Sequence, residues 1–360
     1  MSKSFVHLHA HTEYSMLDGA AKINDYLKKV KELNQPAAAI TDHGNLYGAL
    51  EFVRQAEILD IKPIIGYEAY VTPGSRFDRP ERDKNKRYHL TLLAENNTGY
   101  QNLVELVSKA YLEGFYYKPR VDYDLLKEHA EGIIALSGCL GGEVAQHLAP
   151  DGSREEGNTA NEKSYEKALE KAKNYQNIFG QENFFIELHN HGINQQIQIL
   201  DDLVNISKEI DAPLVATNDS HYVSKNDSSA HDALLCVQTN ATMEDDDRFK
   251  FDGEEYYVKS SEEMRKLFPD ELFPNACDNT LKIADRVNYQ FSFDKDYLPD
   301  FPIDDSSLTV EEFLRKKVFI GAEQKYHEIN TEVQERIDYE LDVINSMGFA
   351  SYFFDCWRFD

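Results

Sequence analysis

Three histidines at alternate positions, His7, His9 and His11, lie near the amino end of the chain, and Asp18 follows a few residues later. In an extended segment, side chains two residues apart point to the same face, so these imidazoles can converge on one metal ion. A surface strand with histidines on its solvent-facing side would show the same spacing. The pattern therefore makes this segment a candidate metal site that needs support from elsewhere in the chain.

Further groups able to bind metals or protons come directly after short apolar runs. The run at 37–41 is followed by Asp42 and His43, as expected of a buried strand that delivers polar groups at its carboxyl end. Four later runs repeat this arrangement, and they end at Glu68, at Cys139, at His189 and His191, and at Asp219 and His221. Such recurrence indicates that one structural plan brings these side chains to a common edge.

The elements that must position these groups alternate between strands and helices. Strand-like runs occupy 4–9, 37–42, 63–68, 89–94, 132–138, 184–188 and 213–218, and apolar residues at helical spacing occupy 24–33, 46–59 and 100–112. This alternation predicts an α/β fold with a parallel sheet of seven strands, closed into a barrel. The active site of such a barrel lies at the carboxyl ends of its strands. His89 is the exception, since it precedes its apolar run.

Beyond about residue 275 the pattern changes. Helices are expected at 275–287, 310–326 and 333–347, with an extended piece at 298–302, and no group of ligand-type residues occurs there. We therefore expect a barrel domain over 1–275 and a small, mostly helical segment over 276–360. Three polar stretches, at 73–87, 150–164 and 244–255, are interpreted as solvated loops without chemistry, the arginines and lysines of the first being the local candidates for contact with a phosphate backbone.

Composition limits the possible functions. The chain of 360 residues is 41% hydrophobic and contains neither an apolar stretch long enough for a membrane helix nor a secretory signal, so we expect a cytoplasmic protein with no membrane partner. Its four cysteines are widely spaced, which argues against a disulfide framework or a zinc knuckle. A net charge of −26 is the opposite of the basic surface typical of nucleic-acid binding, so the isolated chain should bind DNA weakly.

Several motifs together resemble the N-terminal part of bacterial DNA polymerase III alpha subunits, a family whose first domain is a PHP (polymerase and histidinol phosphatase) domain. The resemblance spans nearly the whole chain, and residues 336–353 are similar to the segment that leads into the polymerase core. The residues after Phe353 differ from the family's sequence. We therefore expect this chain to be a truncated or frameshifted reading of a full-length gene. The motifs are His9-Ala10-His11-Thr12, Leu17-Asp18-Gly19, Thr41-Asp42-His43-Gly44-Asn45, Gly66-Tyr67-Glu68-Ala69-Tyr70, Leu136-Ser137-Gly138-Cys139 and Ala216-Thr217-Asn218-Asp219 with His221-Tyr222.

The resemblance implies a distorted seven-stranded PHP barrel that holds two or three divalent metal ions. Position by position, the family's ligands fall on nine residues: His9, His11, Asp18, His43, Glu68, His89, Cys139, Asp219 and His221. Imidazole and carboxylate ligands suit Zn, Mn or Fe, and a thiolate would favour zinc at one position. His7 lies outside the set and is expected to orient a ligand by a hydrogen bond. His189 and His191 also lie outside it, and His129, His147, His231 and His327 are interpreted as ordinary helix or surface residues.

The implied function is metal-dependent phosphodiester hydrolysis of the 3′→5′ exonuclease type, carried by Asp219, Glu68 and His43. Clustered metal ions can activate water and offset the charge of a phosphate group. The substrate would be a DNA 3′ end, the partners would be the rest of the polymerase core and other replisome subunits, and this chain alone would not polymerise DNA. Two alternatives stay open: a non-catalytic scaffold that docks a proofreading exonuclease, and a free-standing phosphoesterase of the histidinol-phosphatase type.

Overall fold

The computed structural model describes residues 4–81, 85–150, 163–291, 302–303, 307–326 and 328–358. The chain divides into two compact units, residues 1–290 and residues 291–360. Among the described residues, no helix has both the length and the apolar character needed to cross a membrane.

The first unit is an α/β fold built on one sheet of seven strands, as expected. Its strands are β1 (Ala37–Ile40), β2 (Lys62–Val71), β3 (Tyr88–Ala94), β4 (Arg120–Val121), β5 (Ile133–Leu136), β6 (Phe184–Leu188) and β7 (Leu214–Ala216). They are hydrogen-bonded in the order β1-β2-β3-β5-β6-β7, and the two-residue β4 pairs with β2 beside this path.

The sheet is mixed, so the expectation of an all-parallel sheet is wrong. β3 runs antiparallel to both of its neighbours, β2 and β5, while the other pairs are parallel. The amino end of β3 therefore lies beside the carboxyl ends of β2 and β5. His89, which precedes its apolar run, reaches the same edge as the other candidate residues for this reason.

The amino-terminal segment closes the curled sheet. We expected a strand over 4–9, but these residues form only isolated bridges, from His7 to Ala38 of β1 and from Ala10 to Ser220 after β7. Backbone hydrogen bonds support both sides, with Ala39 N donating to His7 O at 2.9 Å and His11 N to Ser220 O at 2.8 Å. The segment thus joins the first strand to the last and completes the distorted barrel.

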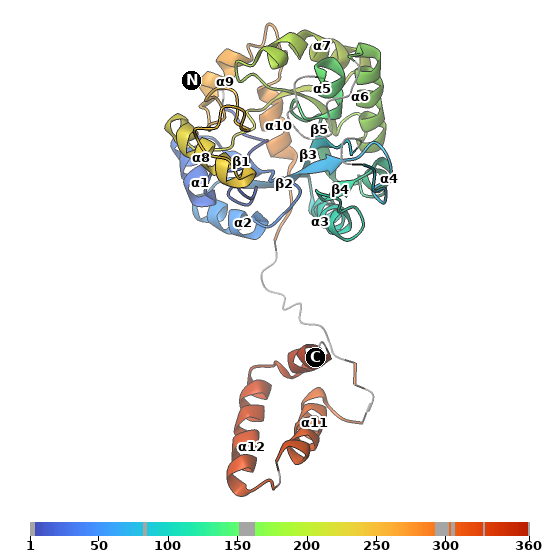
Figure 1. The fold of residues 1–360 in the computed structure, drawn as a ribbon, viewed down its shortest axis with the longest axis vertical. Helices are drawn as coiled ribbons and strands as arrows, with labels where there is room; N and C mark the ends of the chain where they lie inside the picture. Colours follow the sequence, from blue (N-terminus) through green and yellow to red (C-terminus); the bar gives the residue numbers. More distant parts are fainter. Residues whose placement is uncertain are drawn as a thin grey trace. The chain divides into compact units, whose positions relative to one another are not determined.

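Helices surround this barrel (Figure 1). In the first unit they are α1 (Ile23–Glu32), α2 (Ala49–Ile58), α3 (Asn97–Leu112), α4 (Tyr123–Glu128), α5 (Glu143–Leu148), α6 (Tyr165–Phe179), α7 (Asn194–Ile210), the short 3₁₀ helix η3 (Lys225–Asp227), α8 (Ser228–Thr239), α9 (Ser261–Leu267) and α10 (Asp278–Arg286). Several helices have an N-cap residue whose side chain accepts a hydrogen bond from a backbone N–H of the first turn. Asn96 caps α3 in this way, and Ser164 caps α6. The helices expected near 24–33, 46–59 and 100–112 are confirmed as α1, α2 and α3.

The two faces of the sheet belong to two apolar clusters. Leu90 and Leu92 of β3 pack with α3, α6 and α7, whereas Leu93 belongs to a second cluster with Ile64, Ile134 and residues of the amino-terminal segment. The second cluster also contains Ile283, Ala284 and Val287 from α10 and its carboxyl end. We expected the barrel domain to end at residue 275, but this packing includes α10 in the first unit, which runs to residue 290.

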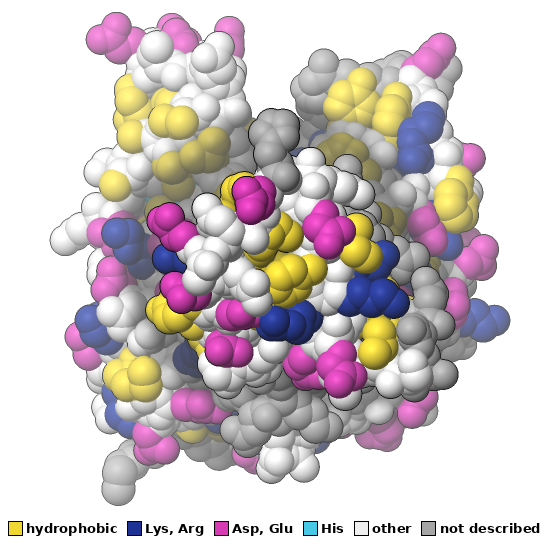
Figure 2. All heavy atoms as spheres, turned by 90° about the horizontal axis from the view of Figure 1, so that it is seen from below, with side chains coloured by type: hydrophobic (Ala, Val, Ile, Leu, Met, Phe, Trp, Pro, Cys, Tyr) yellow, Lys and Arg dark blue, Asp and Glu magenta, His cyan; other side chains and the backbone are white. Residues whose placement is uncertain are grey.

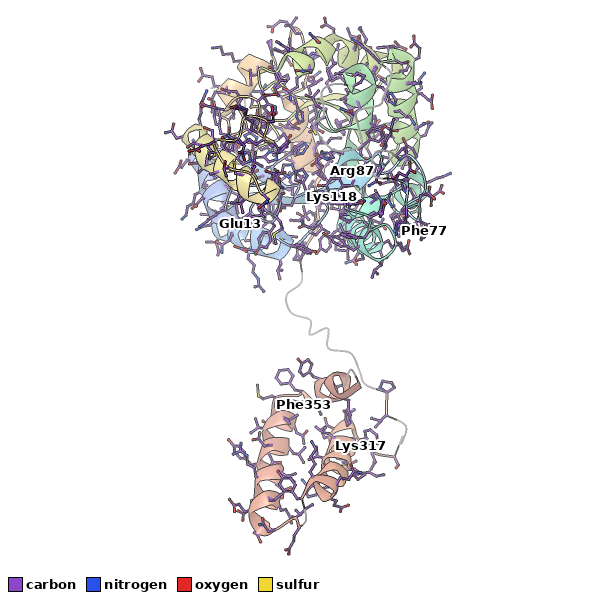
Figure 3. The ribbon with its side chains drawn as sticks, in the orientation of Figure 1. Glu13, Phe77, Arg87, Lys118, Lys317 and Phe353 are labelled. Atoms are coloured by element: carbon purple, nitrogen blue, oxygen red, sulfur yellow. The ribbon has the colours of Figure 1, made fainter. Side chains whose placement is uncertain are left out.

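The second unit consists of α11 (Val310–Lys325), α12 (Thr331–Ser346) and α13 (Ala350–Arg358) around a small apolar cluster that includes Phe313, Leu341 and Phe354. The expected helices at 310–326 and 333–347 are confirmed, while the expected extended piece at 298–302 lies outside the described residues except for Pro302. Several large apolar side chains here are exposed, among them Tyr339, Met347 and Phe353, the last labelled in Figure 3.

Candidate metal centre

The nine predicted ligand residues meet at one rim of the barrel. Residues of β2 show how each strand serves two purposes, since Ile64 contributes to the apolar cluster described above and Glu68, four positions later on the same face, reaches the rim. On β3 the same alternation places Leu93 in that cluster and His89 at the rim. The other seven follow strands or lie in the amino-terminal segment, where backbone leaves the sheet and side chains can turn inward.

Glu68 occupies the middle of the group. Its carboxylate oxygens lie 2.6 Å from His43 Nδ1, 2.9 Å from His89 Nδ1 and 3.3 Å from His9 Nε2. The Cys139 sulfur is 3.7 Å from Glu68 Oε1 and 3.5 Å from His89 Nδ1. This one buried carboxylate therefore connects side chains from the amino-terminal segment, from β3 and from the residues that follow β1 and β5.

Asp219 connects the other side of the group. Its Oδ1 lies 3.1 Å from His11 Nε2 and 3.4 Å from His9 Nε2, and His221 Nε2 lies 3.8 Å from Asp18 Oδ2. Asp18 also lies 2.7 Å from His43 Nε2. Asp219 has a backbone φ of 43°, a left-handed conformation uncommon for residues other than glycine, so local backbone strain accompanies the placement of its carboxylate.

Within the part of the chain that the structure describes, four groups of three side chains have potential ligand atoms within 4.8 Å of one another. Three are drawn entirely from the predicted set: His9 with His11 and Asp219, His11 with His43 and His221, and His43 with Glu68 and His89. Shared histidines link them into one cluster. The arrangement offers adjoining sites for more than one ion.

At Glu68 and His43, the electrostatics of the cluster oppose the effect of burial on the pKa. Burial alone would raise the pKa of Glu68, but the imidazoles of His89 and His43 hold that pKa well below its usual value. Burial alone would lower the pKa of His43, whereas Glu68 and Asp18 raise it to about 9. Burial and the neighbouring His43 and His221 lower the pKa of His11 to about 3. The cluster thus keeps its carboxylates charged and at least one imidazole neutral, the protonation states that bind cations.

Several polar atoms of the cluster lack hydrogen-bond partners of proper geometry among the described residues, which suits them to bind cations. Glu68 Oε2, Asp219 Oδ1 and His221 Nε2 are buried and make no hydrogen bond of proper geometry among the described residues. Buried polar atoms normally have such partners, and a carboxylate and an imidazole left without one are suited to hold a metal ion. The donor set of imidazole, carboxylate and thiol suits divalent Zn, Mn or Fe.

Glu187, which the sequence interpretation missed, lies behind the cluster. Its Oε1 is 2.7 Å from His9 Nδ1 and 3.0 Å from His189 Nε2, and Thr217 donates to it at 2.6 Å. The fourth metal-compatible group consists of His9, Glu187 and His189. A signal was present, because Glu187 is the one charged residue inside the apolar run of β6.

The histidines outside the predicted set have other contacts. His7 Nε2 lies 2.9 Å from the carbonyl of Lys259, so the support expected from His7 is provided by Glu187 instead. His191 contacts the carbonyl of Asn218 and stacks on Tyr256. His231, interpreted as ordinary, is buried on α8, with Nε2 2.8 Å from the carbonyl of Asp18. It therefore supports the backbone of a predicted ligand.

A distorted α/β barrel with a buried cluster of imidazoles and carboxylates at one rim defines an α/β barrel protein with a candidate metal centre. Residues 7–191 match the family model described as "PHP domain", and residues 312–359 match the model described as "Bacterial DNA polymerase III alpha NTPase domain". The chain belongs to the PHP domain family.

Curated relatives are DNA polymerase III alpha subunits. The chain is 44% identical to that of Treponema pallidum over 357 residues, which is 99% of this chain and 29% of the relative. It is 45% identical to that of Mycobacterium tuberculosis H37Rv, covering 97% of this chain and 30% of the relative, and 45% identical to that of Thermus aquaticus, covering 91% and 26%. The chain thus spans less than a third of the length of these relatives.

Solved structures are similar at a lower level. A two-domain protein from Bacteroides vulgatus with a predicted PHP-like metal-dependent phosphoesterase matches with a TM-score of 0.38 and 13% identity, over 79% of this chain and 69% of that one. An amidohydrolase from Chromobacterium violaceum matches with a TM-score of 0.36 and 13% identity, over 61% of this chain and 88% of that one. TM-scores below 0.5 add nothing to the family assignment.

Proposed function

We propose that the barrel is a metal-dependent phosphodiesterase that removes nucleotides from a DNA 3′ end, within a protein of the DNA polymerase III alpha kind. The observation that carries the proposal is the linked set of ligand triads around Glu68 and Asp219. Family membership and the similarity to polymerase III alpha subunits support the substrate class.

The residues that would hold the ions are His9, His11, Asp18, His43, Glu68, His89, Cys139, Asp219 and His221. Bound divalent ions would act as Lewis acids and offset the negative charge of a phosphodiester. Their number and identity, two or three ions of Zn, Mn or Fe, belong to the proposal.

Three of these side chains would also carry the reaction. His43 lies 2.7 Å from Asp18 and 2.6 Å from Glu68, so its imidazole is well placed to hold a proton between two carboxylates. Asp219 lines a pocket that leads to the cluster from outside. We therefore assign proton handling to His43, and to Glu68 and Asp219 we assign the holding of the cations that would bind the scissile phosphate, because the bare carboxylates would repel it.

The helical residues beyond the barrel would belong with the polymerase part of such a protein, which the match at 312–359 supports. The partners would be a DNA 3′ end, the remaining polymerase core and other replisome subunits. We assign hydrolysis, and not polymerisation, to this chain. Acidic side chains are spread among lysines and arginines over the face shown in Figure 2, and the net charge of −26 agrees with weak DNA binding in isolation.

The test is release of nucleoside monophosphate from a single-stranded 3′ end in the presence of Mn²⁺ or Zn²⁺. Asp219→Asn, and the double change His9→Ala with Glu68→Gln, should abolish release, whereas Asp201→Asn on the exposed face of α7 should leave it unchanged. Undiminished release by the Asp219 variant would assign the activity to a different site or to a contaminant.

The scaffold alternative predicts a different combination of results. Stoichiometric metal in the purified chain together with no nuclease activity would favour a structural or docking role. Elemental analysis beside the nuclease assay therefore separates the two functions. Hydrolysis of small phosphomonoesters without release from DNA would favour the phosphatase alternative.

A further inference from the structure

A pocket of about 250 Å³ opens directly beside the candidate ligand cluster. Its lining includes Cys139 and Asp219 of the predicted ligand set together with Phe249, Lys250 and Phe251. An apolar cavity of about 150 Å³ holds one benzene ring, so this volume suits a single planar ring system. We had interpreted residues 244–255 as a solvated loop without chemistry, but this loop supplies the outer wall of the pocket.

The loop is fixed at both ends. Arg248 pairs with Asp232 of α8 through two hydrogen-bonded contacts, and Glu255 pairs with Lys225 and Lys259. His221 N also donates to the carbonyl of Tyr256 at 2.8 Å. These contacts hold the loop against the same backbone that presents the candidate ligand His221.

The aromatic side chains of the loop have different surroundings. The Phe251 ring packs edge-on against His221 at 4.7 Å, His231 at 4.8 Å and Tyr256 at 4.6 Å, so its position is set by neighbours. The Phe249 ring makes an edge contact with Phe251 at 5.9 Å, and Phe249 is partly exposed. Phe251 is therefore a fixed wall, and Phe249 presents ring surface to the pocket.

Polar groups complete the lining. Lys250 brings a positive charge to the lining and Asp252 a negative one, and Gln195 brings an amide able to donate and accept hydrogen bonds. An aromatic platform, a cation and an amide beside a metal cluster match a base, a phosphate and the polar edge of that base.

We propose that this pocket binds the base of the 3′-terminal nucleotide, which stacks on Phe249 while Lys250 contacts the phosphodiester beside the metal cluster. The inference rests on the proposed function and refines it. The substrate is a nucleotide ester with a planar base, and small phosphoesters without a base lack the main binding contact.

Binding can be measured without turnover. The probe is a short single-stranded oligonucleotide with 2-aminopurine at its 3′ end and a phosphorothioate as its last linkage, titrated with the full chain in the presence of Mn²⁺. Stacking should quench the fluorescence of 2-aminopurine. Phe249→Leu should remove the quenching and weaken binding at least about fivefold, the lower bound expected for one lost base–aromatic stack.

The matched control is Phe77→Leu, because Phe77, labelled in Figure 3, is 58% exposed and does not line this pocket. Lys250→Ala should weaken binding and reduce its salt dependence. Lys127→Ala, at an exposed position of α4, should do neither. An oligonucleotide ending in an abasic sugar should bind the wild type and the Phe249 variant equally. Thermal unfolding of each variant checks that the fold is retained.

Equal quenching by the Phe249→Leu and Phe77→Leu variants would overturn the base-binding pocket, as would wild-type affinity that is the same with and without the terminal base. Either result leaves metal-dependent hydrolysis unaffected, because that activity is assayed separately through Asp219. Conversely, quenching by the wild type together with no nucleotide release from an unmodified oligonucleotide would support the pocket and contradict the hydrolase function.

Discussion

The Nδ1 atom of His9 lies 2.7 Å from the Oε1 atom of Glu187, and both side chains are fully buried. The contact fixes the orientation of the imidazole and directs Nε2 towards Glu68 and Asp219. A carboxylate behind a histidine in this way is a recurrent means of orienting a metal ligand. Glu187 also accepts from the backbone N–H of Gly138 at 2.9 Å, so it connects His9 to the residue before Cys139.

Glu187→Gln is therefore expected to weaken metal binding about 10–100-fold, because the amide orients His9 less strongly than the carboxylate does. The measurement is metal titration of the metal-free chain, followed by elemental analysis. Glu182→Gln, at an exposed position near the start of the same strand, is the control and should bind metal normally. Equal affinities of the two variants would contradict an orienting role for Glu187.

Removal of metal should destabilise the first unit. A ligand present at a hundred times its dissociation constant stabilises a protein by about 2.7 kcal/mol, so chelation should lower the melting temperature measurably. Differential scanning calorimetry with and without Zn²⁺ or Mn²⁺ measures the effect. Asp219→Asn should lose most of the metal-dependent increase, and the same increase in that variant would show that stabilisation arises elsewhere.

Alkylation of Cys139 should depend on pH and on metal. Burial, with Glu68 beside it, raises the pKa of the Cys139 thiol to about 11, so in the metal-free chain the reactive thiolate is scarce at neutral pH. The alkylation rate of Cys139 should keep rising until the pH approaches 11. An ordinary cysteine is already ionised below that pH, so its rate would level off earlier. Zinc should suppress the reaction. Mass spectrometry after iodoacetamide treatment reports each cysteine, and a rate unaffected by zinc would argue against Cys139 as a ligand.

Gly138→Ala should disturb both the fold and the cluster. Gly138 has a φ of +89°, and a Cβ atom there would lie 2.5 Å from the carbonyl oxygen of His89. Gly192 has a φ of +78° with nothing within 4 Å of an added Cβ, so Gly192→Ala isolates the backbone strain. We expect a loss of about 1 kcal/mol at Gly192 and roughly 3 kcal/mol or more at Gly138 in urea unfolding. Similar losses at the two glycines would mean that the backbone at Gly138 shifts without cost.

The sequence predicted much of the fold because apolar runs and helical periodicity are local signals. The α/β class, the barrel, six of the seven expected strands and the main helices at 24–33, 310–326 and 333–347 are confirmed, while the seventh strand of the sheet is β4 and not the segment at 4–9. The direction of β3 could not be predicted, because strand orientation depends on pairing with β2 and β5 and leaves no mark in the strand's own residues. The two-residue strand β4 is likewise too short to give a periodic pattern.

The candidate site was predicted to a similar extent. The nine residues named from the sequence lie together, although their role as metal ligands stays a prediction. Glu187 was not singled out, since its contacts with His9 and Gly138 join residues distant in sequence, and Phe249 lies in a stretch interpreted as a solvated loop. His7 shares the spacing of His9 and His11, but its segment is not a regular strand, so alternation fails there and His7 reaches Lys259 instead.

Closure of the barrel by the amino-terminal segment has a consequence for folding order. Ala10 finds its partner at Ser220, far away in sequence, so the segment around Ala10 can complete its pairing only after most of the first unit has been synthesised. Candidate ligands lie on both sides of this seam, with His9 and His11 on one and Asp219 and His221 on the other. A cation bound across the seam would fasten the two ends of the nascent domain together, so its arrival would complete assembly as well as prepare the rim for chemistry.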